Sequence, residues 1–214
     1  LIERIKGHWE HEKLSYIQRN TNRLLHLVNQ LMDYRRAELG IFELRPVYAN
    51  AYKKVLNCFL NYENLSKRKD IDYNLYTELQ DEELLFDETY LDLIVNNLLS
   101  NAFKYTEKGE CITVRLYKED NNLVLQVIDT GVGIPAEKQK KIFERFYQAE
   151  SGHEGSGIGL SLVQRLVELH HGHITLESKV GEGSTFSIYI PQDKSMYTSE
   201  ELLAQEEGAK EQRA

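Results

Sequence analysis

Two asparagines and a lysine, Asn97, Asn101 and Lys104, follow one another at spacings of four and three residues, which places them on one face of a helix. An asparagine carbonyl oxygen can ligate a hard cation such as magnesium, and a lysine beside it can meet a phosphate as a point charge. A solvated polar face is the ordinary alternative, because most surface helices carry one. This polar stripe of Asn97, Asn101 and Lys104 is therefore consistent both with a metal and phosphate site and with an ordinary solvated surface.

The helix that carries this stripe is predicted from its apolar residues. They recur at helical spacing and predict one buried face: Leu91, Ile94, Val95, Leu98, Leu99 and Ala102. Asp87 stands where an N-cap is expected, and Asp92 falls in the first turns, where a negative charge suits the helix dipole. A buried stripe and a polar stripe thus run side by side along the same helix.

Four further motifs follow this helix in order: Asp129–Ile134 (DTGVGI), Phe143–Phe146 (FERF), Gly155–Leu160 (GSGIGL) and Gly181–Phe186 (GEGSTF). Asp129 ends a predicted strand, and the glycines after it let the backbone approach a flat ligand. A buried carboxylate in this place can accept the exocyclic amine of adenine, although aspartate is also a common turn former. Ser184 or Thr185 could add a hydroxyl to the same contact, and the sequence does not choose between them.

The second glycine segment opens a helix that is predicted over residues 158–170. The first amides of a helix have no partner inside it, and the helix dipole makes this end positive. We therefore interpret Gly155, Gly157 and Gly159 as the start of a phosphate-binding helix end.

The composition narrows the function further. The chain has 214 residues with a net charge of −8, which argues against general nucleic-acid binding. Cys58 and Cys111 lie in apolar segments and are predicted to be buried free thiols in a reducing compartment. No apolar run is long enough to span a bilayer, no signal peptide is apparent, and the missing initial Met indicates a piece of a longer protein. A zinc site at His170, His171 and His173 is disfavoured, because no cysteine or carboxylate stands at ligand spacing.

Helices and strands alternate along the rest of the chain. Strands are predicted at 41–48, 71–79, 84–86, 111–117, 123–128, 173–178 and 185–190, and helices at 50–69 and 158–170, with Asn50 as a cap and Gly172 as a helix end. This order predicts an α+β two-layer sandwich, with a mixed sheet packed on helices. Residues 192–214 are polar and are predicted to form a linker.

The first part of the chain contains a heptad seam. The heptad positions of the seam are occupied by Leu14, Ile17, Thr21, Leu24, Val28 and Leu31. The helix is predicted to end near Gly40. This helix could fold back on its own domain, or it could be the second helix of a dimeric four-helix bundle.

Together, the asparagine-bearing helix, the glycine segments and the Phe-x-x-Phe pair resemble the ATP-binding catalytic domain of two-component sensor histidine kinases, a GHKL-type domain with a Bergerat fold. The resemblance covers residues 41–191. Residues 23–33 also resemble the second helix of the dimerisation domain in this family, which favours the bundle. The implied organisation is truncated dimerisation and phosphoacceptor helices at 1–40, the catalytic domain at 41–191 and a linker at 192–214.

The resemblance implies ATP and Mg²⁺ as cofactors, with Asn101 as the metal ligand and Asn97, Asn101 and Lys104 as catalytic residues. It implies a nucleotide site formed by Asn97, Asn101, Lys104, Tyr105, Asp129, Gly131, Gly133, Ile134, Arg145, Phe146, Gly155, Ser156, Gly157, Ile158, Gly159, Leu160, Ser184 and Thr185. A mobile lid is implied between Pro135 and Ser156. Phe143 and Phe146 would anchor it or simply join the core, and Gln148 stands where family members often carry an arginine.

Related ATPases activate water with a glutamate one helical turn before the magnesium asparagine. Asn97 occupies that place here and cannot act as a base, so the expected reaction is phosphoryl transfer to a histidine with slow ATP hydrolysis. His11 lacks the family's His-Glu-x-x-x-Pro setting, so the acceptor histidine is expected upstream of Leu1 and the fragment alone is not expected to phosphorylate itself.

The resemblance also implies partners: a phosphoacceptor helix of the same or a partner chain, a response-regulator receiver domain and a second copy in the full-length homodimer. No nucleic-acid or membrane contact is expected of this fragment, which would be the cytoplasmic portion of an inner-membrane sensor. The sequences of residues 24–33 and 143–148 favour a hybrid sensor. The alternatives are a nucleotide-binding degenerate kinase that acts by binding a partner, and an ATPase or serine kinase with the same pocket.

Overall fold

The computed structural model describes Thr21, Met32 and residues 43–147 and 157–202. The chain divides into two compact units, Leu1–Ile41 and Phe42–Ala214. The predicted heptad helix belongs to the first unit and lies almost entirely outside the described residues. In the part that is described, no helix combines the length and apolar character needed to cross a bilayer.

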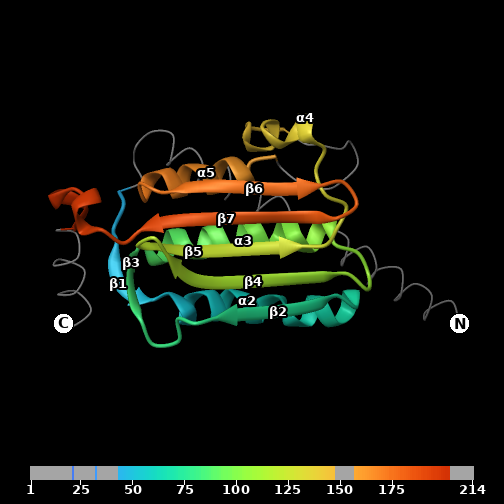
Figure 1. Ribbon diagram of the computed structural model, residues 1–214, viewed down its shortest axis with the longest axis horizontal. Helices are drawn as coiled ribbons and strands as arrows, with labels where there is room; N and C mark the ends of the chain where they lie inside the picture. Colours follow the sequence, from blue (N-terminus) through green and yellow to red (C-terminus); the bar gives the residue numbers. More distant parts are fainter. Residues whose placement is uncertain (1–20, 22–31, 33–42, 148–156, 203–214) are drawn as a thin grey trace, which may run out of the picture. The chain divides into compact units, whose positions relative to one another are not determined.

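A five-stranded sheet forms one layer of the second unit (Figure 1). Its strands lie in the order β2 (Asp72–Thr77), β4 (Cys111–Glu119), β5 (Asn122–Asp129), β7 (Gly183–Pro191) and β6 (His173–Lys179). β2 and β4 are parallel and the other neighbours are antiparallel. One face of the sheet is covered by α2 (Ala51–Lys69), α3 (Glu88–Tyr105) and α5 (Gly159–Leu169). The predicted mixed sheet packed on helices is confirmed.

The central helix α3 buries the stripe that the sequence predicted. Leu91, Ile94, Val95, Leu98 and Leu99 are each at most 1% exposed, and Ala102 is 4% exposed. Asp87 caps the helix, since its Oδ1 accepts the backbone N–H groups of Thr89 and Tyr90 at 2.9 and 3.0 Å. Burial of this stripe fixes the rotation of α3 and therefore the direction of its polar stripe.

A second, two-stranded sheet is formed by β1 (Val47–Asn50) and β3 (Glu83–Phe86). The predicted strand at 41–48 is wrong in its bounds, because residues 43–46 are irregular and the strand continues to Asn50. Pro46 explains the late start, since it lacks the N–H that a strand ladder needs. Asn50 then caps α2 as predicted, accepting the N–H of Lys53 at 2.9 Å.

The end of α5 also differs from the prediction. His170 is the C-cap, and His171 rather than Gly172 takes the left-handed conformation, with φ of 57°. Gly172 has another reason to lack a side chain, because a Cβ there would lie 2.0 Å from the carbonyl oxygen of Tyr189.

The residues after β7 pack on the domain instead of beginning a linker at Gln192. The Gln192 side chain bonds the N–H and C=O of Leu85 at 2.8 and 3.2 Å, on the edge of β3. After the short 3₁₀ helix η2 (Lys194–Met196), Tyr197 is 5% exposed and its hydroxyl donates to the carbonyl of Pro191 at 2.9 Å. Packed residues therefore extend past the predicted boundary, to Tyr197.

Candidate nucleotide-binding site

Three polar side chains form a row across the ends of β5, β7 and β6. Asp129 is paired with Ser184, and Ser184 is paired with Ser178. Directly paired residues of antiparallel strands point to the same face of the sheet, which here is the face that also carries the buried Val127 and Phe186. The Oγ atoms of Ser178 and Ser184 are 3.0 Å apart. The row therefore lies on the face that the helices cover.

The register separates the two hydroxyl candidates that the sequence left open. Thr185 is paired with Ile128, so both belong to the opposite face of the sheet. Ser184 is buried and shares the face of Asp129, whereas Thr185 is half-buried on the other face. The geometry favours Ser184 as the partner of Asp129.

Asp129 is a buried carboxylate, only 7% exposed. Burial raises the pKa of Asp129 to about 6, while hydrogen bonds from the backbone amides of Gly131 and Ser184 act in the opposite direction. The Gly131 N–H lies 3.0 Å from Oδ1. Because a carboxylate has about four lone-pair positions, these two amides leave room for a further donor such as an amine.

The loop after Asp129 packs against the C-terminal end of α3. The N–H of Val132 donates to the carbonyl of Tyr105 at 3.4 Å, and a Cβ on Gly131 would lie 2.1 Å from the same oxygen. Glycine at 131 is thus required by a close approach between backbones. Asn101 and Tyr105 are four residues apart and share one face of α3, so the polar stripe ends at this loop.

The other end of the stripe meets α5. The Asn97 Nδ2 donates to the carbonyl of Leu93 at 2.7 Å, and a Cβ on Gly159 would lie 2.8 Å from Asn97 Oδ1. From Asn97 to Tyr105 the helix rises about 12 Å, with Asn101 half-way along. The stripe therefore runs from the first residue of α5 to the loop beside the buried carboxylate, as a nucleotide with its base at Asp129 and its phosphates at α5 would require.

The cationic and aromatic candidates occupy different settings. Lys104 Nζ lies 4.7 Å from the centroid of the Tyr105 ring, and both side chains are half-buried on the stripe. Arg145 is exposed. Phe146 is 65% exposed with φ of 60°, and its N–H donates to Gly157 O at 2.9 Å, so it is not part of the core, and its role as an anchor of the lid stays a prediction.

The remaining candidates are placed as follows. Ile158 is buried at 4% exposure, Leu160 is half-buried, and Gly133 lies against the backbone of Lys179. Gly155, Ser156 and Gln148 are outside the described residues.

Two residues that the sequence did not mark hold the first glycine segment in place. Ser178 Oγ accepts the N–H of Ile134 at 2.8 Å and donates to Gly183 O at 2.9 Å. Gln139 Nε2 donates to the carbonyls of Ile134 and Ser178 at 3.0 and 2.9 Å. Only the register of β6 on β7 shows that Ser178 belongs to the site, because its sequence neighbours carry no motif.

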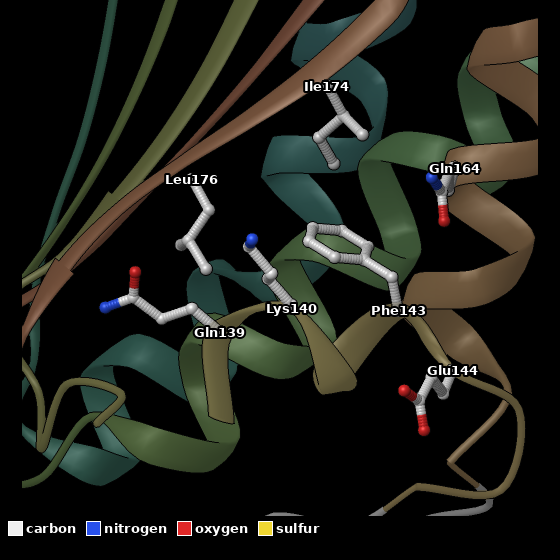
Figure 2. A pocket seen from close by; sticks show the side chains of 7 residues that line it. All are labelled: Gln139, Lys140, Phe143, Glu144, Gln164, Ile174 and Leu176. Carbon is white, nitrogen blue, oxygen red and sulfur yellow. The ribbon is translucent and has the colours of Figure 1, made fainter. Parts of the chain in front are cut away.

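A groove of about 480 Å³ lies beside this region, between β6, α5 and the segment that contains α4 (Ala136–Gln139) and the 3₁₀ helix η1 (Lys141–Phe143). Ile174 and Leu176 approach Phe143 across an apolar floor (Figure 2). Its rim is polar, with Gln139, Lys140, Glu144 and Gln164. None of its lining residues is a predicted nucleotide ligand, but Gln139 also bonds the carbonyl of Ser178, so the groove adjoins the Asp129 row.

The fold and this site place the chain in a known family. Residues 86–194, half of the chain, match the model of the histidine kinase-, DNA gyrase B- and HSP90-like ATPases. The chain belongs to this family, and within it to the catalytic domains of histidine kinases.

Relatives with similar sequences are histidine kinases. Histidine kinase P4 of Formosa agariphila is 31% identical over 201 residues, which are 91% of this chain and 15% of that protein. The circadian input-output histidine kinase CikA of Synechococcus elongatus is 33% identical over 189 residues, 86% of this chain and 25% of that protein. The chain thus spans a quarter or less of the length of these two relatives.

Solved structures show the same fold. Full-length ShkA, determined in complex with AMPPNP, superposes with a TM-score of 0.72 at 26% identity, covering 78% of this chain and 35% of ShkA. Histidine kinase AdeS of Acinetobacter baumannii reaches 0.68 at 20% identity over 80% of this chain and 79% of AdeS, which concerns the fold alone.

Proposed function

We propose that this domain binds Mg-ATP and transfers the γ-phosphoryl group to a histidine side chain on dimerisation helices, for relay to an aspartate of a response regulator. The observation that carries the proposal is the position of the α3 polar stripe, which joins the buried Asp129 row at one end and the start of α5 at the other. Histidine kinase relatives and the AMPPNP complex of ShkA support the nucleotide and the reaction class.

Each part of the stripe would have its own role. Asp129 accepts the adenine amine, and Ser184 adds a hydroxyl on the same face of the sheet. Asn101 offers its carbonyl oxygen to magnesium, which supplies charge neutralisation on the phosphates when it is bound. Lys104 and Tyr105, toward the Asp129 end of the stripe, would meet the phosphate nearest the nucleoside, and the first amides of α5 would face the phosphates at the far end.

Transfer is favoured over hydrolysis by the chemistry of position 97. A carboxamide cannot take a proton from water, and the Nδ2 of Asn97 is already engaged with Leu93 O. Without a base at this place, turnover with water should be slow, and a neutral imidazole is the better nucleophile. Catalysis then rests on positioning and on neutralisation of charge.

The proposed partners follow from the same reaction. A receiver domain as partner is supported by histidine kinase ThkA, which has the same fold at 23% identity and was solved in complex with the response regulator TrrA. Homodimerisation would use the helices of residues 1–40, in the cytoplasmic portion of an inner-membrane sensor.

The test is Mg-ATP binding by titration calorimetry, followed by transfer of labelled phosphate to a separately supplied acceptor helical hairpin. Asn101→Asp and Asp129→Asn should both abolish measurable binding. Asn96→Ala is the matched control, because Asn96 faces α2, donating to Asp92 O at 2.8 Å and to Cys58 Sγ at 3.4 Å. Binding without any transfer would instead identify a nucleotide-sensing module, and unchanged binding in both variants would refute the residue roles.

A further inference from the structure

Asn97 is held in one orientation by its own helix. Its Nδ2 donates to Leu93 O at 2.7 Å, four residues earlier, so its Oδ1 is turned away from that carbonyl. Oδ1 faces the first residue of α5: a Cβ built on Gly159 would lie 2.8 Å from Oδ1 and 3.7 Å from Cγ. Apart from its chain neighbours and the backbone of α5 itself, no other atom of the described residues comes within 4 Å of that Cβ.

The start of α5 has an apolar N-cap residue. Its N-cap residue is Ile158, whose side chain makes no capping hydrogen bond, and the first N–H bonded to a carbonyl of this helix is that of Leu162, to Ile158 O at 2.9 Å. The N–H groups before it have no acceptor inside the helix. The Asn97 carboxamide from α3 therefore lies beside the first residue of this helix.

We propose that Asn97 is a positioning residue that sets the place of the α5 N-terminus relative to α3, and that position 159 is glycine because this carboxamide occupies the space of a side chain. The inference rests on the proposed function, because it concerns the phosphate end of the same site. Asn101 is one turn from Asn97 on α3, so the contact at Gly159 keeps the metal ligand and the phosphate-binding amides in register.

A competing explanation is that Gly159 lacks a side chain so that the phosphates can approach its backbone. The two explanations differ in what an alanine at 159 requires. If the ligand excludes the methyl group, the identity of residue 97 does not matter. If Asn97 excludes it, shortening Asn97 makes room.

The experiment is a double-mutant cycle on the intact chain, with Gly159→Ala, Asn97→Ala and the double variant. The first readout is thermal unfolding without nucleotide. Gly159→Ala should lower Tm, because the Asn97 side chain must give up its hydrogen bond with Leu93 O to make room for the methyl group. In the Asn97→Ala background the same change should no longer lower Tm, since alanine is the better helix former. Asn96→Ala is the matched control background, and there Gly159→Ala should lower Tm as much as in the wild type.

The second readout separates phosphate positioning from general damage. Gly159→Ala should raise the Kd for Mg-ATP about tenfold, or about 1.4 kcal/mol, and leave the Kd for adenosine within about twofold. In the Asn97→Ala background the added Gly159→Ala should change the Kd for Mg-ATP by less than about twofold.

A loss of ATP affinity that persists in the Asn97→Ala background would overturn the inference, as would equal losses for ATP and adenosine. Additive changes in Tm would overturn it too. A wild-type chain that binds no Mg-ATP would refute the proposed function, and the nucleotide-free Tm cycle would still decide whether Asn97 imposes the glycine.

Discussion

Asp129→Asn should make the protein more stable while it removes adenine binding. Burial raises the pKa of Asp129 to about 6 from an ordinary 3.8, so the folded protein holds this proton more tightly than the unfolded chain does. At about 1.4 kcal/mol per pKa unit, a shift of about two units means that ionised Asp129 costs the fold up to about 3 kcal/mol.

The sign of this cost fixes a pH window. The destabilisation is fully present above the folded pKa near 6 and fades as pH falls toward the unfolded value of 3.8, because Asp129 is then neutral in both states. An asparagine is neutral throughout and keeps an acceptor for the Gly131 N–H. The variant should therefore exceed the wild type in stability by up to about 3 kcal/mol at neutral pH, with the gap closing toward about pH 4.

The assay is urea unfolding without nucleotide at a series of pH values. Adenosine affinity is measured in parallel, since adenosine has no phosphates that titrate in this range. Wild-type affinity should fall as pH drops through about 6, because protonated Asp129 loses an acceptor. Asp193→Asn is the control: a hydrogen bond from Ser195 lowers the pKa of this exposed residue, so its replacement should bring no gain in stability.

The reasoning would be refuted by an Asp129→Asn protein that is less stable than the wild type by the same amount at every pH. That result would mean that the carboxylate contributes through its hydrogen bonds with Gly131 and Ser184, and that burial costs it little.

Three further changes test other parts of the structure. Gly131→Ala should destabilise the fold by about 1–3 kcal/mol and weaken adenosine binding, since its methyl group would meet Tyr105 O at 2.1 Å; equal melting curves would contradict this. Tyr197→Ala should cost about 3 kcal/mol in urea unfolding, whereas Met196→Ala, at a residue 48% exposed, should cost little. Burial lowers the pKa of His170, so stability should be complete above about pH 6.5 and fall below it, and His170→Gln should flatten that slope in a pH series of melts.

Local patterns account for the elements that the sequence predicted well. The buried stripe of α3 follows from a spacing of three and four residues, and Asp87 and Asn50 cap helices through atoms within three residues of themselves. The choice between Ser184 and Thr185 is of another kind, because it depends on which residue of β5 each one opposes. That register is set by contacts far apart in the chain, and no local signal carries it.

The misplaced boundary at Pro191 has the same cause. Residues 192–202 are polar and read as a linker, but Gln192 bonds Leu85, 107 residues earlier, and Tyr197 fills a buried position against the end of α5. Phe146 shows the opposite case, since this apolar residue of a motif could have joined the core but is exposed, with a left-handed backbone. Composition predicts burial on average, whereas single hydrogen bonds and backbone angles decide these positions.

The two ends of α3 make contacts of different kinds. At its N-terminal end Asp87 accepts the N–H of Arg45 at 3.0 Å and donates its own N–H to His170 Nε2 at 3.1 Å, while His170 O accepts the Tyr197 hydroxyl at 3.4 Å. The segments by which the chain enters and leaves the domain are thus tied to one capping residue. From Asn97 onward the same helix carries the polar stripe toward the Asp129 loop. Because α3 is one continuous helix from Glu88 to Tyr105, it links the entry and exit of the chain to the proposed metal and phosphate ligands.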